Sequence, residues 1–149
     1  TMTKLAITSG YFNPLHPGHI DCFEMSKSVA GADEVWVIVN NDRQAFLKRG
    51  VESFQNELYR CRLVSALKSV DRTFLSVDED GSVCQSLVLL IKEARETGKY
   101  DEIIFTKGGD RFASNCPEAA ILAENNVKIV DGLGAKTHNS SDYAIKKAN

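Results

Sequence analysis

The sequence lacks closely spaced cysteines. Four cysteines are scattered along the chain, and no two of them show the C-x-x-C spacing of a zinc site or of a redox motif; they are Cys22, Cys61, Cys84 and Cys116. The pattern therefore predicts no metal ligands among these thiols. We expect all four to be reduced, as is usual in a cytoplasmic protein.

Long apolar runs and an excess of charge are also missing. No apolar run approaches the roughly 18 residues that a membrane span needs. The first residues, TMTKLAIT, are too short and too weakly charged for a signal peptide. The formal net charge of -2 excludes a bulk nucleic-acid binder and a basic membrane-surface protein. We expect a cytoplasmic protein without nucleic-acid or membrane partners, in which a local site binds any anionic ligand.

Short apolar runs alternate with longer amphipathic ones through all 149 residues, which predicts a single α/β domain over residues 1–149. The predicted strands are Lys4–Ser9, Glu34–Asn40, Arg72–Val77, Glu102–Thr106 and Val127–Val130. The predicted helices are Pro17–Ala30, Gln55–Ser69, Ser82–Thr97, Pro117–Asn125 and a last one from about Ser140 to Lys147. This order favours a parallel five-stranded sheet with helices on both faces.

One predicted helix carries clear boundary signals. Ser82 precedes its first apolar residues and Gln85 follows three positions later, which is typical of a capping box. Gly98 is suited to end the helix. The side chains expected on its buried face are Leu87, Leu90, Ile91 and Ala94.

The loop after the first predicted strand, GYFNPLHPGH, holds two histidines at the start of a predicted helix. Gly10 permits a backbone turn that a side chain would hinder, and Pro17 suits a first helical turn. His16 and His19 would then lie where unpaired N–H groups and the helix dipole favour an anion, such as a phosphate. Taken alone, the pair could equally be two surface histidines, and no third metal ligand is evident nearby.

Three other loops also follow predicted strands, and in a parallel sheet such loops meet at one edge. FLKRG supplies Lys48, TKGGDR supplies adjacent glycines between charged residues, and GAKTHNSSD supplies hydroxyl groups at a predicted helix start. Each alone could be an ordinary turn. Neither the Walker pattern GxxxxGK[ST] nor the dinucleotide pattern GxGxxG occurs. Together the loops favour phosphoryl-transfer chemistry by positioning and electrostatics.

Four segments in this order resemble the cytidylyltransferase-like nucleotidyltransferases. GYFNPLHPGHI looks like their HxGH signature, and NELYRCRLVSALKSVD is similar to their segment between the second and third strands. KGGDR and NSSDYAIKK resemble their third and fourth motifs. The resemblance covers nearly the whole chain. It implies a Rossmann-like three-layer α/β/α domain that joins a nucleoside triphosphate to a phosphorylated small molecule and releases pyrophosphate.

The resemblance also implies roles for individual residues. His16 and His19 would stabilise charge on the α-phosphate and the bridging oxygen, and Lys48 would meet the phosphates as a mobile basic residue. Mg²⁺ is the implied cofactor, held by the triphosphate and by no protein metal site. Arg62 matches a position that is often arginine. The implied nucleotide-binding residues are Gly10, Tyr11, Phe12, Asn13, Gly18, Lys107, Gly108, Gly109, Asp110, Arg111, Asn139, Ser140 and Ser141.

Two positions depart from the family pattern. Asn13 stands where relatives commonly carry aspartate, and His138 precedes the last motif where relatives more often carry glycine or cysteine. The resemblance leaves the nucleotide open, with a slight preference for CTP and a glycerol-phosphate-like acceptor over ATP and a heptose-phosphate-like acceptor. A non-catalytic nucleotide-binding domain is a further alternative. Relatives are often dimers, and Trp36 and Phe46 are apolar residues that we expect to be exposed in a homodimer-forming chain.

Overall fold

A computed structural model gives the fold and describes residues 2–109 and 116–134. Strands and helices alternate along these residues, as the sequence predicts, except that two helices, not one, separate the second and third strands. The elements are β1 (Lys4–Gly10), α1 (Pro17–Ser28), β2 (Glu34–Val39), α2 (Asp42–Arg49), α3 (Glu57–Ser65), β3 (Arg72–Leu75), α4 (Cys84–Thr97), β4 (Glu102–Gly108), α5 (Ala119–Glu124) and β5 (Lys128–Leu133).

The five strands form one parallel sheet in the order β3-β2-β1-β4-β5. The central strand β1 pairs on one side with β2 and on the other with β4, so that Ile7 lies between Trp36 and Phe105. After β1 the chain adds β2 and β3 on one side of this strand. It then crosses over and adds β4 and β5 on the other side of β1. Such a reversal places a ligand crevice beyond the carboxyl ends of the central strands. The predicted Rossmann-like α/β fold is confirmed.

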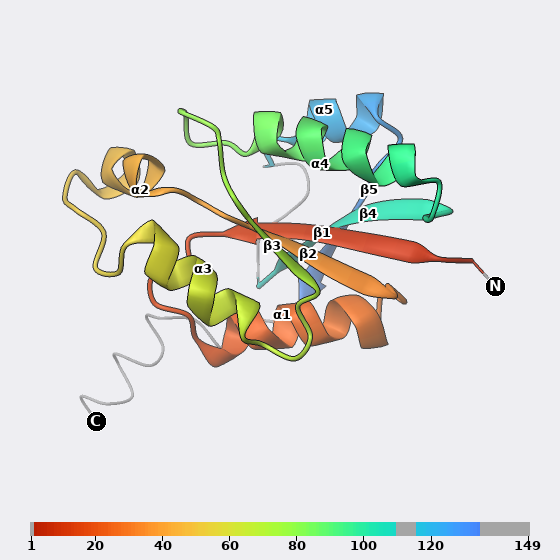
Figure 1. The fold of residues 1–149 in the computed structure, drawn as a ribbon, viewed down its shortest axis with the longest axis horizontal. Helices are drawn as coiled ribbons and strands as arrows, with labels where there is room; N and C mark the ends of the chain where they lie inside the picture. The colour runs from red at the N-terminus through yellow and green to blue at the C-terminus, as the bar shows by residue number, and fades with distance from the viewer. Residues whose placement is uncertain (1, 110–115, 135–149) are drawn as a thin grey trace.

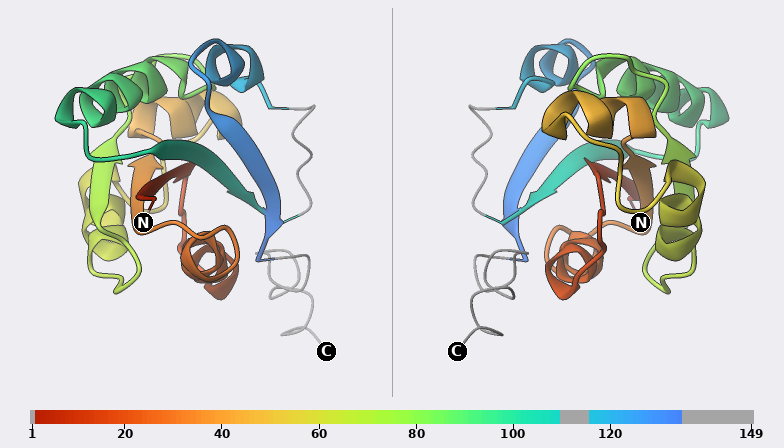
Figure 2. Two further views of the ribbon diagram at one scale, coloured as in Figure 1. Left: turned by 90° about the vertical axis from the view of Figure 1, so that its right-hand side faces the viewer. Right: turned by 90° about the vertical axis from the view of Figure 1, so that its left-hand side faces the viewer.

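Helices cover both faces of the sheet, with α1 and α3 on one face and α4 and α5 on the other (Figures 1 and 2). Alternate residues of the strands enter two separate cores. Leu5 and Ile7 pack with the apolar face of α4, whereas Ala6 and Val37 pack with residues of α1 and α3. This is the alternation that a strand buried on both faces produces.

Two expectations about apolar residues can be compared with this core. The predicted apolar face of α4, Leu87, Leu90, Ile91 and Ala94, is buried. The expectation that Trp36 is exposed is wrong, because β2 lies inside the sheet and the Trp36 ring, only 6% exposed, packs in the α4 core and against Tyr100. Phe46 is 51% exposed, as expected.

The start of α4 differs from the predicted capping box. The helix begins after Val83, and the side chain that caps it is Asp78. The Asp78 carboxylate accepts hydrogen bonds from the backbone N–H groups of Gln85 (2.7 Å) and Ser86 (3.0 Å) and from the Ser86 hydroxyl (2.6 Å). An acceptor from the preceding loop thus satisfies the helix N-terminus, and Gly98 ends the helix in the left-handed conformation as predicted.

Helix α2 was not predicted, because its sequence DRQAFLKR has no apolar periodicity. Its start is fixed by a reciprocal cap: the Asn41 side chain accepts from Gln44 N (2.9 Å), and the Gln44 side chain accepts from Asn41 N (3.0 Å). The FLKRG segment is therefore mainly helical. The predicted helix 140–147 lies outside the described residues.

None of the helices in the described residues combines the length and the apolar character that crossing a bilayer requires.

Candidate active site at the start of helix α1

The candidate site lies beyond the carboxyl end of β1, where the chain enters α1. His16 is the N-cap residue, and its Nδ1 accepts a hydrogen bond from Gly18 N (3.1 Å). His19, three residues later, accepts from His16 N through its own Nδ1 (3.1 Å). The two imidazoles thus form a reciprocal capping box, in which each ring satisfies one backbone donor of the first turn.

These bonds determine which ring nitrogen carries the proton. A nitrogen that accepts an N–H bond is unprotonated, so a neutral ring in either position carries its proton on Nε2. The rings of His16 and His19 stack with centroids 3.8 Å apart and an interplanar angle of 25°. Each of the two stacked rings therefore carries its Nε2–H donor at a helix N-terminus, which is a place suited to a phosphate.

Phe12 and Gly10 hold this arrangement from the side of β1. The Phe12 ring is 3% exposed and meets the His19 ring edge-on, with centroids 4.9 Å apart. A side chain at Gly10 would collide with the Phe12 ring, because a Cβ there would lie 2.8 Å from it. Gly10 is thus required for the position of Phe12, which in turn supports His19.

Asn13 joins the loop after β1 to the connection between α2 and α3. Its side-chain Nδ2 donates to Ser53 Oγ (2.8 Å), and its Oδ1 accepts from Gln55 N (3.1 Å). Ser53 donates its own hydroxyl proton to the Gln55 carbonyl oxygen, so it has only lone pairs to offer to Asn13. An amide at position 13 therefore matches its neighbours better than a carboxylate, which has no donor when ionised.

Arg60 is the buried centre of the same region. Its fully buried guanidinium donates to the carbonyl oxygens of Tyr11 (2.7 Å), Asn40 (2.6 Å) and Gln55 (2.9 Å) and pairs with Asp42 Oδ1 (2.8 Å). One side chain thus links the ends of β1 and β2 to the starts of α2 and α3.

Arg62, which the resemblance matches to a position that is often arginine, takes no part in this network. Arg62 is exposed, whereas Arg60, two residues earlier, is enclosed by hydrogen-bond acceptors. The sequence signal that could have identified Arg60 is its place one turn after Asn56, the N-cap of α3, where a long side chain can reach back to the preceding loop.

Lys48 lies near the first loop, as the sequence predicts, although α2 carries it and not a turn. Its Nζ is 4.5 Å from the centroid of the Tyr11 ring. Tyr11 follows β1 directly, so the ammonium group borders the loop that contains the histidines. The exposed stem of Lys48 gives the charge room to reach a bound phosphate.

The ends of β4 and β5 reach α1 through two glycines. A Cβ at Gly108 would lie 2.9 Å from the Leu133 carbonyl oxygen, and one at Gly134 would lie 2.9 Å from Cys22 N and 3.1 Å from the Gly18 carbonyl oxygen. These contacts put the exit of β5 against the first turns of α1. Lys107 and Gly109 also fall at this end of β4. Asp110, Arg111, His138, Asn139, Ser140 and Ser141 lie outside the described residues.

Three of the described cysteines are poor nucleophiles. Burial raises the pKa of Cys22 to about 11, and burial also raises the pKa of Cys61 and Cys116. These thiols stay protonated at neutral pH. Within residues 2–109 and 116–134, no group of three His, Cys, Asp or Glu side chains could hold a metal ion. The described donor set therefore does not fit a resident metal centre.

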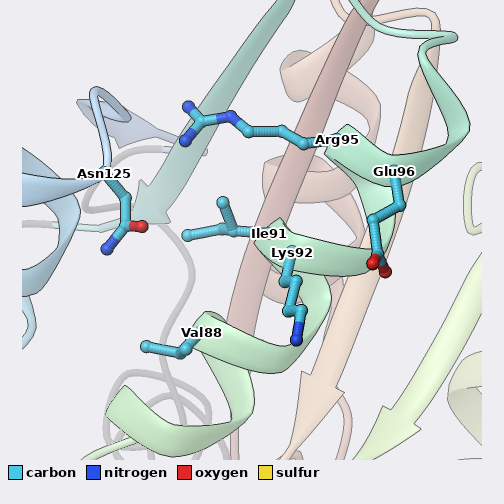
Figure 3. Close-up of a pocket in the computed structure, with 6 residues that line it drawn as sticks. All are labelled: Val88, Ile91, Lys92, Arg95, Glu96 and Asn125. Carbon is cyan, nitrogen blue, oxygen red and sulfur yellow. The ribbon is translucent and has the colours of Figure 1, made fainter.

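A surface depression of about 450 Å³ lies elsewhere, between α4 and the end of α5 (Figure 3). Its lining residues are Val88, Ile91, Lys92, Arg95, Glu96 and Asn125. It contains none of the predicted site residues. We therefore place the candidate chemistry at α1 and not in this depression.

Several known proteins are similar to this chain. The model of a family described as cytidylyltransferase-like matches residues 7–131. The chain is 32% identical over 124 residues to a FAD synthase of Methanocorpusculum labreanum, covering 83% of this chain and 77% of that protein. It is 36% identical over 128 residues to the bifunctional protein HldE of Gluconobacter oxydans, covering 85% of this chain but 24% of that protein.

A similar solved structure is the lipopolysaccharide core biosynthesis protein from Thermoplasma volcanium GSS1. It superimposes with a TM-score of 0.63 at 30% identity, covering 88% of this chain and 96% of that chain.

The role of Asn13 as a hydrogen-bond donor can be tested with a double-mutant cycle. Asn13→Asp forces either Ser53 or Gln55 to lose a partner, so we expect it to lower the free energy of unfolding by about 1 kcal/mol. In a Ser53→Ala background the conflict with Ser53 is gone, and the same change should cost markedly less. Urea unfolding of the four proteins measures the difference. Equal costs in both backgrounds would contradict the assigned role.

Proposed function

The chain belongs to the cytidylyltransferase-like family, and on that premise we propose that it transfers a nucleoside monophosphate from a nucleoside triphosphate to a phosphorylated small molecule. The observation that carries this proposal is the pair of Nε2–H donors that His16 and His19 present at the N-terminus of α1. A nucleoside triphosphate supplies the anionic groups that such a site favours.

The proposed reaction is one in-line displacement. A phosphate oxygen of the acceptor forms a bond to the α-phosphorus, the bond from that phosphorus to the bridging oxygen breaks, and pyrophosphate leaves with the electron pair. The Nε2–H groups of His16 and His19 stabilise the charge that grows on the α-phosphate and the bridging oxygen. Lys48 attracts the departing phosphates. No covalent intermediate is needed, which agrees with the protonated state of the nearby thiols.

A divalent cation is expected to enter with the triphosphate. Mg²⁺ would offset phosphate charge there. The described residues offer no cluster that would hold it without the nucleotide. We therefore assign no residue of the described chain to a metal.

We propose ATP as the donor nucleotide. The sequence alone slightly favours CTP, but the relatives do not support that preference. One of them is named FAD synthase, after a product that contains an adenylyl group. Among acceptors we retain phosphorylated polyols and sugars. A flavin phosphate is itself a phosphorylated polyol with a ring system attached, so it belongs in the same set.

The one feature that favours the non-catalytic alternative is Asn13, which departs from the family pattern. The hydrogen bonds of Asn13 to Ser53 and Gln55 give this residue a positioning role that does not require a carboxylate. The His16 and His19 rings stack at the start of α1, and Lys48 lies over the Tyr11 ring. These observations favour the enzyme.

A pyrophosphate-release assay tests the proposal. ATP and CTP, each with Mg²⁺, are combined with glycerol phosphate, ribitol phosphate, heptose phosphate and flavin mononucleotide. We expect release that depends on one acceptor and proceeds faster with ATP. Nucleotide binding by calorimetry without release from any pair would support the non-catalytic alternative.

A substitution at His19 can separate two roles of its ring: Nδ1 accepts the hydrogen bond that caps α1, and Nε2–H is the proposed donor to the phosphate. His19→Asn retains an acceptor near the Nδ1 position and removes the Nε2–H, so the fold should persist while kcat falls by about 10²-fold or more. The affinity for the triphosphate should change much less. Lys92→Ala, a basic residue of α4 outside the site, is the control and should leave kcat unchanged. Equal losses of kcat and of nucleotide affinity in His19→Asn would contradict a transition-state role.

A further inference from the structure

A small polar cluster is buried in the layer between α1 and the sheet. Its four residues are 5% exposed or less and come from β1, α1 and β4; they are Thr8, Cys22, Ser26 and Thr106. The buried residues of this layer are otherwise mainly apolar, among them Ala6, Phe23 and Ile104. We call the four residues the α1–β4 cluster. A buried hydroxyl group without a partner costs free energy, so the hydrogen bonds of these residues show what the cluster joins.

The hydroxyl groups of the cluster join three elements. Thr8 Oγ1 donates to the Thr106 carbonyl oxygen (2.7 Å), which connects β1 to β4. Ser26 Oγ lies 2.8 Å from the Cys22 carbonyl oxygen and 2.8 Å from Thr106 Oγ1, which connects α1 to β4. The Cys22 thiol hydrogen-bonds to all three hydroxyl groups. The cluster therefore bonds α1 through side chains to two inner strands of the sheet.

These hydrogen bonds define the position of α1 more narrowly than the apolar contacts around them. Hydrophobic burial is non-directional, so it holds a helix on a sheet without defining how far the helix is shifted along it. A hydrogen bond weakens when its atoms leave a separation of about 3 Å or a nearly linear arrangement. A shift of α1 relative to β4 would break the bond between Ser26 and Thr106 in a buried layer, where neither hydroxyl finds water instead.

The cluster lies between the two parts of the chain that the proposed function brings to one triphosphate. On α1, His19 precedes Cys22 by three residues, which is nearly one helical turn. On β4, Lys107 and Gly108 follow Thr106 directly. A Cβ at Gly108 would lie 3.2 Å from the Cβ of Cys22 and 3.4 Å from its Sγ, so the strand approaches the helix closely at this point.

The strands β1 and β4 also separate at the cluster. Their backbone pairing ends at Ile7 and Phe105. The hydrogen bond from Thr8 to Thr106 follows one residue later, towards the carboxyl edge where a ligand crevice is expected. A side chain therefore joins the two strands at the point where their backbones no longer pair.

We propose that Ser26 and Thr106 are positioning residues for nucleotidyl transfer, an inference that rests on the proposed function. Their hydrogen bond holds α1, and with it the Nε2–H donors of His16 and His19, at a fixed distance from the loop after β4. Neither Ser26 nor Thr106 touches a reacting atom, because both are 0% exposed. A misplacement of about 1 Å can lower a rate by about 10²-fold, so a bond that fixes this distance affects the reaction from a remote place.

The kinetics of Thr106→Val test the proposal. Valine keeps the shape of threonine and the carbonyl oxygen that Thr8 uses, and it removes the hydroxyl that meets Ser26. We expect kcat for pyrophosphate release to fall by about tenfold or more, with the KM for the triphosphate changed by less than about threefold. Thr106→Ser restores the hydroxyl and should recover most of the lost kcat. Thr73→Val is the matched control: its Oγ1 on β3 is buried and has no hydrogen-bond partner among the described residues, so kcat should not change.

A purely structural role of the bond predicts other results. Ile91→Val removes one methyl group from a side chain that is 2% exposed in the α4 core, so it lowers stability on the other face of the sheet and should keep its kcat. The positioning role is wrong if Ile91→Val and Thr106→Val lose kcat in proportion to their losses of unfolding free energy. It is also wrong if Thr106→Val keeps full kcat in an active chain. An unaltered chain that releases no pyrophosphate with any pair refutes the proposed function, and the positioning role with it.

Hydrogen exchange tests the hold on α1 without any turnover. The backbone amides of residues 19–26 should exchange at least about tenfold faster in Thr106→Val than in the unaltered chain, and at an unchanged rate in Thr73→Val. Equal exchange in all three proteins would show that the bond does not hold the helix. If Thr106→Val does not fold, Ser26→Ala takes its place, with the same expectations for kcat and for exchange.

Discussion

The reciprocal hydrogen bonds between the rings of His16 and His19 and the backbone at the start of α1 are the constraint on which the account depends. They satisfy two donors that a helix N-terminus otherwise leaves unpaired. They also assign the proton of each neutral ring to Nε2, so that each histidine offers one Nε2–H donor. The same bonds therefore begin the helix and form the candidate anion site. Loss of either hydrogen bond would therefore affect both the start of α1 and the donors that the rings offer to an anion.

The remainder of the site supports this helix start from three directions. Phe12 packs on His19 from the β1 side, and the closely approaching backbone at Gly108 and Gly134 packs on the first turns of α1 from the β4 and β5 side. Arg60 ties the loop after β1 to α2, which carries Lys48 to the Tyr11 ring. Gln44 of α2 and Arg60 of α3 are buried because they make these bonds. Several apolar residues of the same helices therefore lie on the surface.

Periodicity and turn residues were sufficient to predict the five strands and four of the helices, because buried parallel strands and the amphipathic α4 have strong local patterns. They failed at α2, where the helix depends on a polar cap between Asn41 and Gln44 and on the long-range bonds of Gln44. They also failed at Ser82 and Trp36. At the start of α4 the capping carboxylate comes from Asp78, in the loop before the helix, and not from the expected Ser82. Trp36 is buried because β2 pairs on both sides within the sheet and α4 covers it, which are contacts that a local pattern does not show. The histidines could be predicted because their cap is local, within four residues.

The most direct measurement of the central claim is the protonation of the histidine ring nitrogens by long-range ¹H–¹⁵N correlation NMR at neutral pH. The chain has three histidines, so single substitutions assign the signals. The account predicts that His16 and His19 are both neutral, with an unprotonated Nδ1 and a proton on Nε2, and that their Nε2 signals shift when a triphosphate is added. A proton on Nδ1 of either ring would contradict the reciprocal cap and, with it, the proposed pair of phosphate donors.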